Sequence, residues 1–188
     1  MGKKLLHTWG YDTEGKVIHV NETEKGGAYT CPLCGDRLIA RNGGKVQRPH
    51  FAHFKKTSKK CNGTSVLHHL FKEKAAALLQ THISEHSPFP IQWSCPYCSK
   101  IYQRNLLQRV AGLSTNEAID RHTPDILLTD KDNSPLIAIE LLVSRKLSKK
   151  IIQLYETRGI ILIQIRIAEV DWDNVGNKLH HPDSVSFC

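Results

Sequence analysis

The chain has 188 residues, with 26 Lys and Arg against 18 Asp and Glu, which gives a net charge of +8 and a pI near 9.2. Its hydrophobic share of 40% and charged share of 23% are close to the globular average, which excludes disorder as the main state. No apolar run is long enough for a bilayer crossing, and no secretion signal is visible, so we expect a cytoplasmic protein without a membrane span. The positive charge is compatible with a polyanionic partner but does not identify one.

The first third of the chain is predicted to form a small β-rich module, assigned to residues 1–62. Residues 8–20 are typical of a hairpin with its turn at 12–15. A tight turn at 31–35 is followed by strands at 37–40 and 46–54. Because this segment is poor in apolar residues, we expect a metal ion to help it fold.

Residues 63–188 are predicted to form a second domain. A helix capped by Thr64 or Ser65 runs to about His82, and a hairpin follows at about 91–106. Later elements are, in order, a strand at 125–128, a turn-rich linker, a strand at 136–143, a helix at about 147–158 and a strand at 160–167. This order predicts an α/β sandwich around one mixed sheet.

Two acidic residues are predicted to face each other across the strands at 125–128 and 136–143. If the linker closes symmetrically about Asp132 and Asn133, Asp125 lies directly opposite Glu140. Directly opposed side chains have Cβ atoms about 4.5–5.5 Å apart, and like charges so close must be compensated. A slip of one residue would put the two acids on opposite faces.

A hard divalent ion would compensate this pair. Mg²⁺ prefers oxygen ligands, here from Asp125, Glu140 and the Leu141 carbonyl. The alternative is that Glu140 pairs with an Arg or Lys at a sheet edge. A metal beside a basic surface suits hydrolysis of phosphodiesters, because the ion neutralises phosphate charge and lowers the pKa of a bound water.

Three further residues are candidates to assist that water. They are Lys146, which follows Glu140 shortly along the chain, and Lys72 with His68 on the first helix. His68 and Lys72 share a helix face because they are four residues apart. Each lysine fits a solvated surface position equally well.

Four of the six cysteines form two Cys-x-x-Cys pairs, which is typical of zinc sites rather than disulfides in a cytoplasmic chain. Zinc takes four nitrogen or sulfur ligands in a tetrahedral array. The first site is predicted from Cys31, Cys34, His53 and Cys61, with His50 as the substitute.

The second pair, Cys95 and Cys98, has several ways to complete a site. The remaining ligands would come from His82 and His86, from Cys188, or from His180 and His181. Alternatively, the four thiolates of both pairs hold one ion. We therefore expect one or two zinc ions, structural in each case because full protein ligation leaves no open position.

Several of these motifs together carry a family resemblance. They are Pro124-Asp125, Ile139-Glu140-Leu141-Leu142, the helix with Ser65, His68 and Lys72, the turn Cys31-Pro32-Leu33-Cys34-Gly35, and His50-Phe51-Ala52-His53. Over roughly residues 28–167 the chain resembles the competence-protein CoiA-like nucleases, which belong to the PD-(D/E)xK restriction-endonuclease-like superfamily.

The resemblance implies an αβββαβ core that hydrolyses DNA with Mg²⁺ or Mn²⁺, with Asp125 and Glu140 as metal ligands and Glu117 as a further acid. It implies competence-related DNA processing or defence against foreign DNA, and a homodimer. The superfamily's lysine would fall at Leu142. Either Lys146 or Lys72 takes that role, or the protein is a zinc-containing nucleic-acid-binding protein that cuts poorly or not at all.

Overall fold

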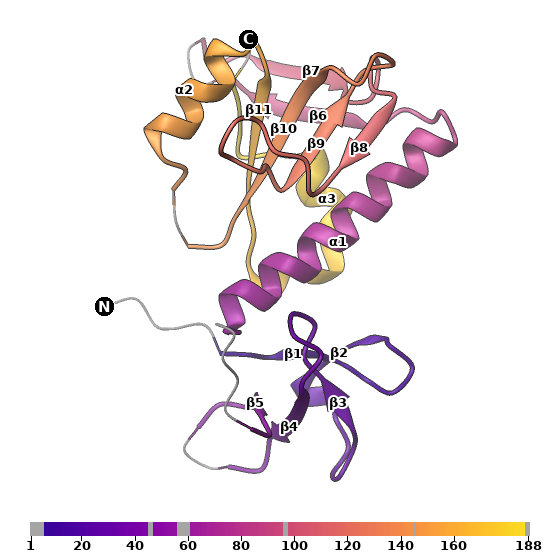
Figure 1. The fold of residues 1–188 in the computed structure, drawn as a ribbon, viewed down its shortest axis with the longest axis vertical. Coiled ribbons are helices and arrows are strands. Elements are labelled where there is room, and N and C mark those ends of the chain that lie inside the picture. The colour runs from indigo at the N-terminus through magenta and orange to yellow at the C-terminus, as the bar shows by residue number, and fades with distance from the viewer. Residues whose placement is uncertain (1–5, 45–46, 56–60, 96–97, 145, 187–188) are drawn as a thin grey trace. The chain divides into compact units, whose positions relative to one another are not determined.

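The computed structural model describes residues 6–44, 47–55, 61–95, 98–144 and 146–186. The chain divides into two compact units between Leu70 and Phe71, a boundary that lies inside the long helix α1 (Gly63–Ser84) (Figure 1). The predicted boundary between residues 62 and 63 coincides with the start of this helix. Among the described residues, no helix combines the length and the apolar character that crossing a bilayer requires.

The first unit contains a five-stranded sheet in the order β2-β1-β3-β4-β5. The predicted hairpin is confirmed, because Tyr11 pairs with Val17. The 3-10 turn η1 (Val20–Glu22) follows it. The strands are β1 (Trp9–Tyr11), β2 (Val17–His19), β3 (Tyr29–Thr30), β4 (Arg37–Arg41) and β5 (His50–His53). Only a few large side chains are buried here, Leu38 and Phe51 among them, so the apolar core is small.

Helix α1 begins at Gly63, two or three positions earlier than a cap at Thr64 or Ser65 predicts, and its cap is different. The Asn62 side-chain oxygen accepts a hydrogen bond from the Ser65 N–H at 3.0 Å. Asn62 therefore caps the helix, and the prediction of Thr64 or Ser65 is wrong. Ser65 is the third residue of the helix, and its N–H is one that an N-cap side chain satisfies.

The second unit is a mixed α/β structure, as predicted. Its main sheet has the order β12-β11-β10-β9-β8, in which β10 and β11 are parallel and the other pairs are antiparallel. The strands are β8 (Gly112–Ser114), β9 (Ile126–Thr129), β10 (Pro135–Leu142), β11 (Ile161–Arg166) and β12 (Ser184–Val185). Helix α2 (Lys149–Thr157) connects β10 to β11.

The predicted hairpin at 91–106 is also confirmed and forms a separate two-stranded sheet of β6 (Pro90–Ser94) and β7 (Ile101–Asn105). The short elements η2 (Glu169–Asn174), α3 (Val175–His180), β8 and β12 were not predicted.

The two faces of the main sheet have separate cores. Ile137 and Ile139 belong to the larger core, which includes residues of α1, β6 and β11. Ala138 belongs to a smaller core with Tyr155 of α2. Because side chains alternate along a strand, Glu140 of β10 lies on the face of Ala138, the side that α2 covers.

Candidate metal centres

The structure brings Cys31, Cys34, His53 and Cys61 together in the first unit. One ligand atom from each lies within 4.8 Å of all the others. The first two residues lie in the turn between β3 and β4, His53 ends β5, and Cys61 precedes α1. These are the four residues favoured from the sequence.

The local backbone explains the position of the two sulfurs. The Cys31 N–H donates to the Asp36 carbonyl at 2.9 Å, and the Gly35 N–H donates to the Cys31 carbonyl at 2.8 Å. Gly35 has φ of 73°, a conformation that glycine adopts without steric cost. The chain therefore turns tightly, and one loop supplies two ligands.

The cluster fits a zinc ion. Cys34 Sγ lies 3.3 Å from His53 Nε2. Zinc bonds of about 2.3 Å to sulfur and about 2.0 Å to nitrogen place two tetrahedral ligands about 3.5 Å apart. Burial raises the pKa of the Cys31 thiol to about 12, so a nearby cation is needed to keep it as a thiolate ligand. This Cys/His cluster could therefore bind zinc, whereas His50 lies outside it and its Nδ1 is 2.9 Å from the Arg48 carbonyl.

The second Cys-x-x-Cys pair is arranged differently from the prediction. Cys95 is buried and disulfide-bonded, whereas Cys98 is exposed and is not part of a disulfide. A disulfide sulfur does not act as a thiolate ligand, so this pair is not a two-thiolate zinc knuckle in the structure. The Cys98 sulfur lies 3.5 Å from the Tyr102 hydroxyl, and this contact lowers the pKa of the thiol.

The histidines considered for the second site have other surroundings. His82 Nδ1 lies 2.8 Å from the Ser87 hydroxyl, and the His180 ring stacks on Phe89 with centroids 4.2 Å apart. Within the described ranges, no group of three metal-binding side chains contains His82, His86, His180 or His181. Cys188 lies outside the described residues.

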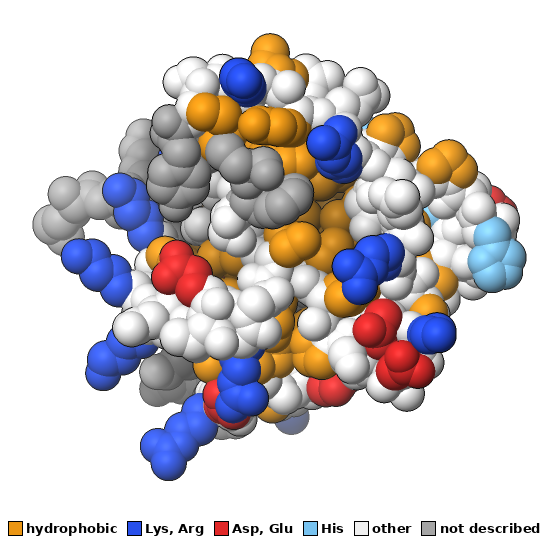
Figure 2. Space-filling model, turned by 90° about the horizontal axis from the view of Figure 1, so that it is seen from above, with side chains coloured by type: hydrophobic (Ala, Val, Ile, Leu, Met, Phe, Trp, Pro, Cys, Tyr) orange, Lys and Arg blue, Asp and Glu red, His pale blue; other side chains and the backbone are white. Residues whose placement is uncertain are grey.

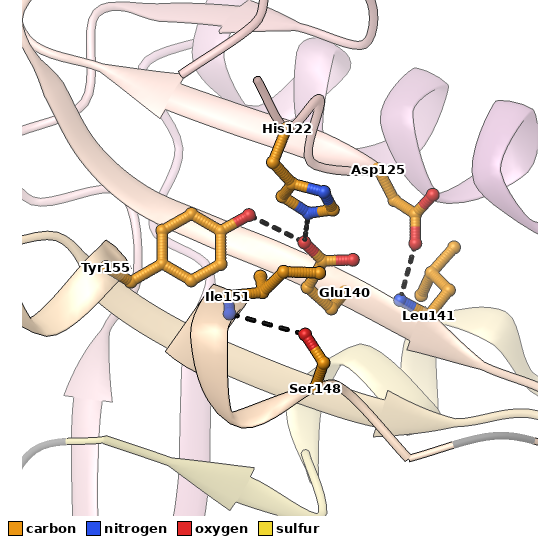
Figure 3. A network of polar contacts seen from close by, with 7 residues as sticks. All are labelled: His122, Asp125, Glu140, Leu141, Ser148, Ile151 and Tyr155. Atoms are coloured by element: carbon orange, nitrogen blue, oxygen red, sulfur yellow. Dashed lines mark hydrogen bonds and ion pairs between the residues drawn. The ribbon is translucent and has the colours of Figure 1, made fainter. Parts of the chain in front are cut away.

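The two acids of the second unit have the predicted register. Ala138 pairs with Leu127 and Ile139 with Ile126, so continuing the ladder by one residue puts Asp125 opposite Glu140. Asp125 Oδ2 accepts the Leu141 N–H at 2.8 Å (Figure 3). The symmetric pairing fails only near the linker, where the register shifts between Pro135 and Ile137.

Glu140 is buried, with 5% of its surface exposed, and it has two partners that the sequence analysis missed. The Tyr155 hydroxyl donates to Glu140 Oε1 at 2.6 Å, and His122 Nε2 lies 2.6 Å from the same oxygen. Figure 3 shows the second Glu140 oxygen on the side of Asp125. The partner of Glu140 is thus a histidine and a tyrosine, not the Arg or Lys considered as the alternative.

A signal for one of these partners was available. Tyr155 follows Ile151 by four residues on the apolar face of α2, and a buried tyrosine hydroxyl needs a hydrogen-bond partner. His122 lies in the loop before β9, where it forms an isolated β-bridge with Ile119, and carries no periodic signal.

Burial raises the pKa of Glu140, and the negative charge of Asp125 raises it further. The hydrogen bonds from Tyr155 and His122 act in the opposite direction because they stabilise the carboxylate. Two carboxylates that repel each other, one buried and one half-buried, form an arrangement that a cation would stabilise.

The other predicted site residues lie around this centre or apart from it. Lys72 Nζ donates to the Thr115 carbonyl at 3.3 Å, while Glu117 and Lys146 are exposed in loops. Leu142 is the half-buried last residue of β10, and His68 lies on the part of α1 that belongs to the first unit. In the described part of the chain, the side-chain hydrogen bonds of Glu140 go to Tyr155 and His122 and to none of these residues.

A cavity of about 350 Å³ lies on the other face of the main sheet, lined by Ile137 and Ile163 together with residues of β6 and β7. Figure 2 shows one side of the molecule, on which apolar side chains gather in the middle and charged side chains of both signs lie around them. Because Glu140 points to the opposite face of the sheet, this cavity is not part of the acidic centre.

Comparison with curated proteins and with solved structures gives no match to this chain. Residues 14–63 match the family model for the N-terminal domain of competence protein CoiA. The matched range contains the whole Cys/His cluster and ends before Asp125 and Glu140. The N-terminal part of the chain is therefore similar to that domain.

Proposed function

We propose that this protein is a metal-dependent DNA nuclease of competence-related DNA processing, in which Asp125 and Glu140 hold Mg²⁺ or Mn²⁺. The proposal rests on one observation, that the carboxylates of Asp125 and Glu140 are both held in position by hydrogen bonds. The Leu141 N–H holds one oxygen of Asp125, and Tyr155 with His122 holds one oxygen of Glu140. The second oxygen of Glu140 is on the side of Asp125 (Figure 3).

The ligand number suits this chemistry. Mg²⁺ is commonly bound by one or two carboxylates and completes its shell with water and substrate phosphate oxygens. When bound, the ion would neutralise phosphate charge and lower the pKa of a water that attacks the phosphodiester. The protein's own contribution is to orient both carboxylates, through one backbone N–H and two side chains, before DNA arrives.

The order of elements also supports the proposal. From α1 onward the chain has one helix, the antiparallel strands β8 to β10, helix α2 and the parallel strand β11, with the β6-β7 hairpin inserted. This is the αβββαβ order of a restriction-endonuclease-like core. The match to a competence protein domain supports a role in DNA uptake or processing.

A second candidate function is DNA binding with weak or no cleavage. Leu142 stands where the superfamily has its lysine, and an aliphatic side chain cannot assist a water molecule. Lys72 is already bonded to a backbone carbonyl, and Lys146 is exposed in a loop. The second candidate rests on these observations.

A cleavage assay separates the two candidates. Supercoiled plasmid and single-stranded DNA are incubated with protein and Mg²⁺ or Mn²⁺, beside Asp125→Asn and Glu140→Gln, which preserve side-chain size. We expect each substitution to lower the cleavage rate by about 100-fold or more. Asp132→Asn, in the exposed turn between β9 and β10, is the matched control and should cleave like the wild type.

Cleavage that survives in both active-site variants would refute the acidic centre. DNA that is bound but not cut with either metal would establish the second candidate. If cleavage occurs, Lys72→Gln and Lys146→Gln identify which lysine takes the role left open by Leu142.

A further inference from the structure

One face of the first unit is open and carries chemistry that neither metal centre uses. We define the β4-β5 face by six residues. Arg37, Ile39 and Arg41 come from β4, His50 and Ala52 come from β5, and Phe54 directly follows β5. Ile39 pairs with Ala52 and Arg41 with His50, and the Phe54 N–H donates to the Arg37 carbonyl at 3.0 Å. Because paired side chains share one side of a sheet, these six residues lie on one face.

The opposite side of the same strands is the inner one. Leu38 and Phe51 are 1% and 2% exposed there, and His53 of the Cys/His cluster is on that side as well. The cluster and the small core therefore lie on the inner side of β4 and β5. On the outer side, within the described part of the chain, Arg37, Ile39, Arg41 and Phe54 are exposed.

The aromatic ring on the β4-β5 face is unusually exposed. Phe54 has 55% of its surface exposed and Ile39 has 39%. The Arg37 guanidinium lies 5.1 Å from the centroid of the Phe54 ring, a cation–π contact that fixes the ring beside a positive charge.

The charge of the β4-β5 face is of one sign. Its six positions contain two arginines and a histidine and no acid. Lys55 after Phe54 and Arg48 before β5 are also exposed and add to the positive charge. A polyanion is the complementary partner, because each cation that neutralises a phosphate releases a counterion.

We propose that the β4-β5 face binds single-stranded DNA, with an unpaired base stacked on Phe54 and phosphates held by Arg37 and Arg41. Proteins that bind single strands combine a positive track for the backbone with aromatic rings for the bases. Base pairs in a duplex hide the base faces, so Phe54 adds affinity only for an unpaired strand. The choice of DNA rests on the proposed function, whereas the surface itself does not depend on the acidic centre.

The test is a titration of the full, zinc-loaded chain without added Mg²⁺. A labelled oligothymidylate of about 20 nucleotides and a duplex of the same length are the probes, and fluorescence anisotropy reports binding. Stacking contributes about 1–3 kcal/mol per base, so Phe54→Ala should weaken single-strand binding by about fivefold or more. Duplex binding should change by less than about twofold. Phe54→Tyr should keep the wild-type affinity, because tyrosine retains the ring.

The contribution of the arginines is measured separately, through the salt dependence of the DNA affinity. Arg37→Gln and Arg41→Gln should each reduce the slope of log affinity against log salt by about 0.7 for the single strand. Lys16→Gln, in the turn between β1 and β2, is the charge control, and Val170→Ala, 84% exposed in the second unit, is the apolar control. Zinc content and thermal unfolding show that each variant is folded.

Equal losses for duplex and single strand in Phe54→Ala, or no loss for either, would overturn the proposal. Tighter binding of an oligouridylate than of the oligothymidylate would assign the β4-β5 face to RNA and overturn the choice of DNA. Repeating the titration with Asp125→Asn separates the two claims. Failure of the wild type to cleave, with intact single-strand binding, counts against the nuclease alone. Absence of the Phe54 effect on binding counts against this surface alone.

Discussion

The two candidate metal centres differ in ligand type and in how many ligands the protein supplies. The Cys/His cluster offers three sulfurs and one nitrogen, a complete tetrahedral set. The acidic centre offers the carboxylates of Asp125 and Glu140, which leave most of an octahedral shell to water and substrate. A closed site of soft ligands stabilises a fold, whereas an open site of hard ligands leaves room for chemistry.

The surroundings of the two centres differ in the same way. The cluster is held by a tight turn and short strands with a small core, so a metal bound there would supply part of the folding energy. The acids lie on β10 and beside β9, both buried in the main sheet, so their positions are set by packing before any metal binds.

The largest expected effect is loss of the Cys/His cluster. Cys31→Ser removes a buried ligand, and because metal binding and folding are coupled in small metal modules, we expect zinc release and unfolding of the first unit. Elemental analysis of the native protein and amide spectra by NMR measure both effects.

The matched control is Cys98→Ser, which changes an exposed cysteine outside the Cys/His cluster. It should keep the zinc content and the spectrum of the first unit. Equal zinc loss in the two variants would contradict the assignment of a single four-ligand cluster.

The second largest expected effect is a loss of stability in the second unit, where packing rather than a metal ion positions the acidic centre. Tyr155→Phe deletes the hydroxyl that donates to the buried Glu140. A hydrogen bond to a charged group contributes about 1.5–3 kcal/mol, so we expect a loss of about 2 kcal/mol in the free energy of unfolding. Urea denaturation measures this loss.

Tyr102→Phe is the control for the same chemical change. Its hydroxyl has a weak contact with the Cys98 sulfur at 3.5 Å, so the free energy of unfolding should change by less than about 0.5 kcal/mol. A similar loss in both variants would mean that the Tyr155 hydroxyl has no special role at Glu140.

A smaller effect is the pH dependence that Glu140 produces. Folding raises the pKa of this carboxyl above its usual value near 4.5, so the folded chain keeps the proton to a higher pH than the unfolded chain. The stability contributed by Glu140 is complete below that value and is lost as pH rises through the raised pKa. Relative to Glu140→Gln, the wild type should lose stability from about pH 4.5 towards neutral pH.

Unfolding of both proteins at several pH values measures this difference. Added Mg²⁺ should restore the wild type at neutral pH and leave Glu140→Gln unchanged, because only the carboxylate binds the cation. A difference that is constant with pH would contradict the burial of an ionisable Glu140.

The two centres were also unequally predictable from the sequence. Cys-x-x-Cys spacing and a symmetric linker are local features, and they located the four cluster residues and the opposition of Asp125 to Glu140. His122 was missed because it reaches Glu140 from a loop, where no periodicity indicates which way a side chain points. The state of Cys95 was missed because spacing alone does not distinguish a thiolate from a disulfide.

The smallest expected effect concerns the loop that carries His122. Arg158, the residue after α2, forms an ion pair of 2.7 Å with Asp120, and their side chains are 56% and 47% exposed. Exposed pairs contribute about 0.2–1 kcal/mol because water screens them, so Arg158→Gln should cost less than about 1 kcal/mol. A double-mutant cycle with Asp120→Asn measures the coupling by urea denaturation. A coupling well above this value would mean that a surface pair, and not the packed sheet alone, holds His122 at Glu140, so the acidic centre would depend on its loops much as the Cys/His cluster does.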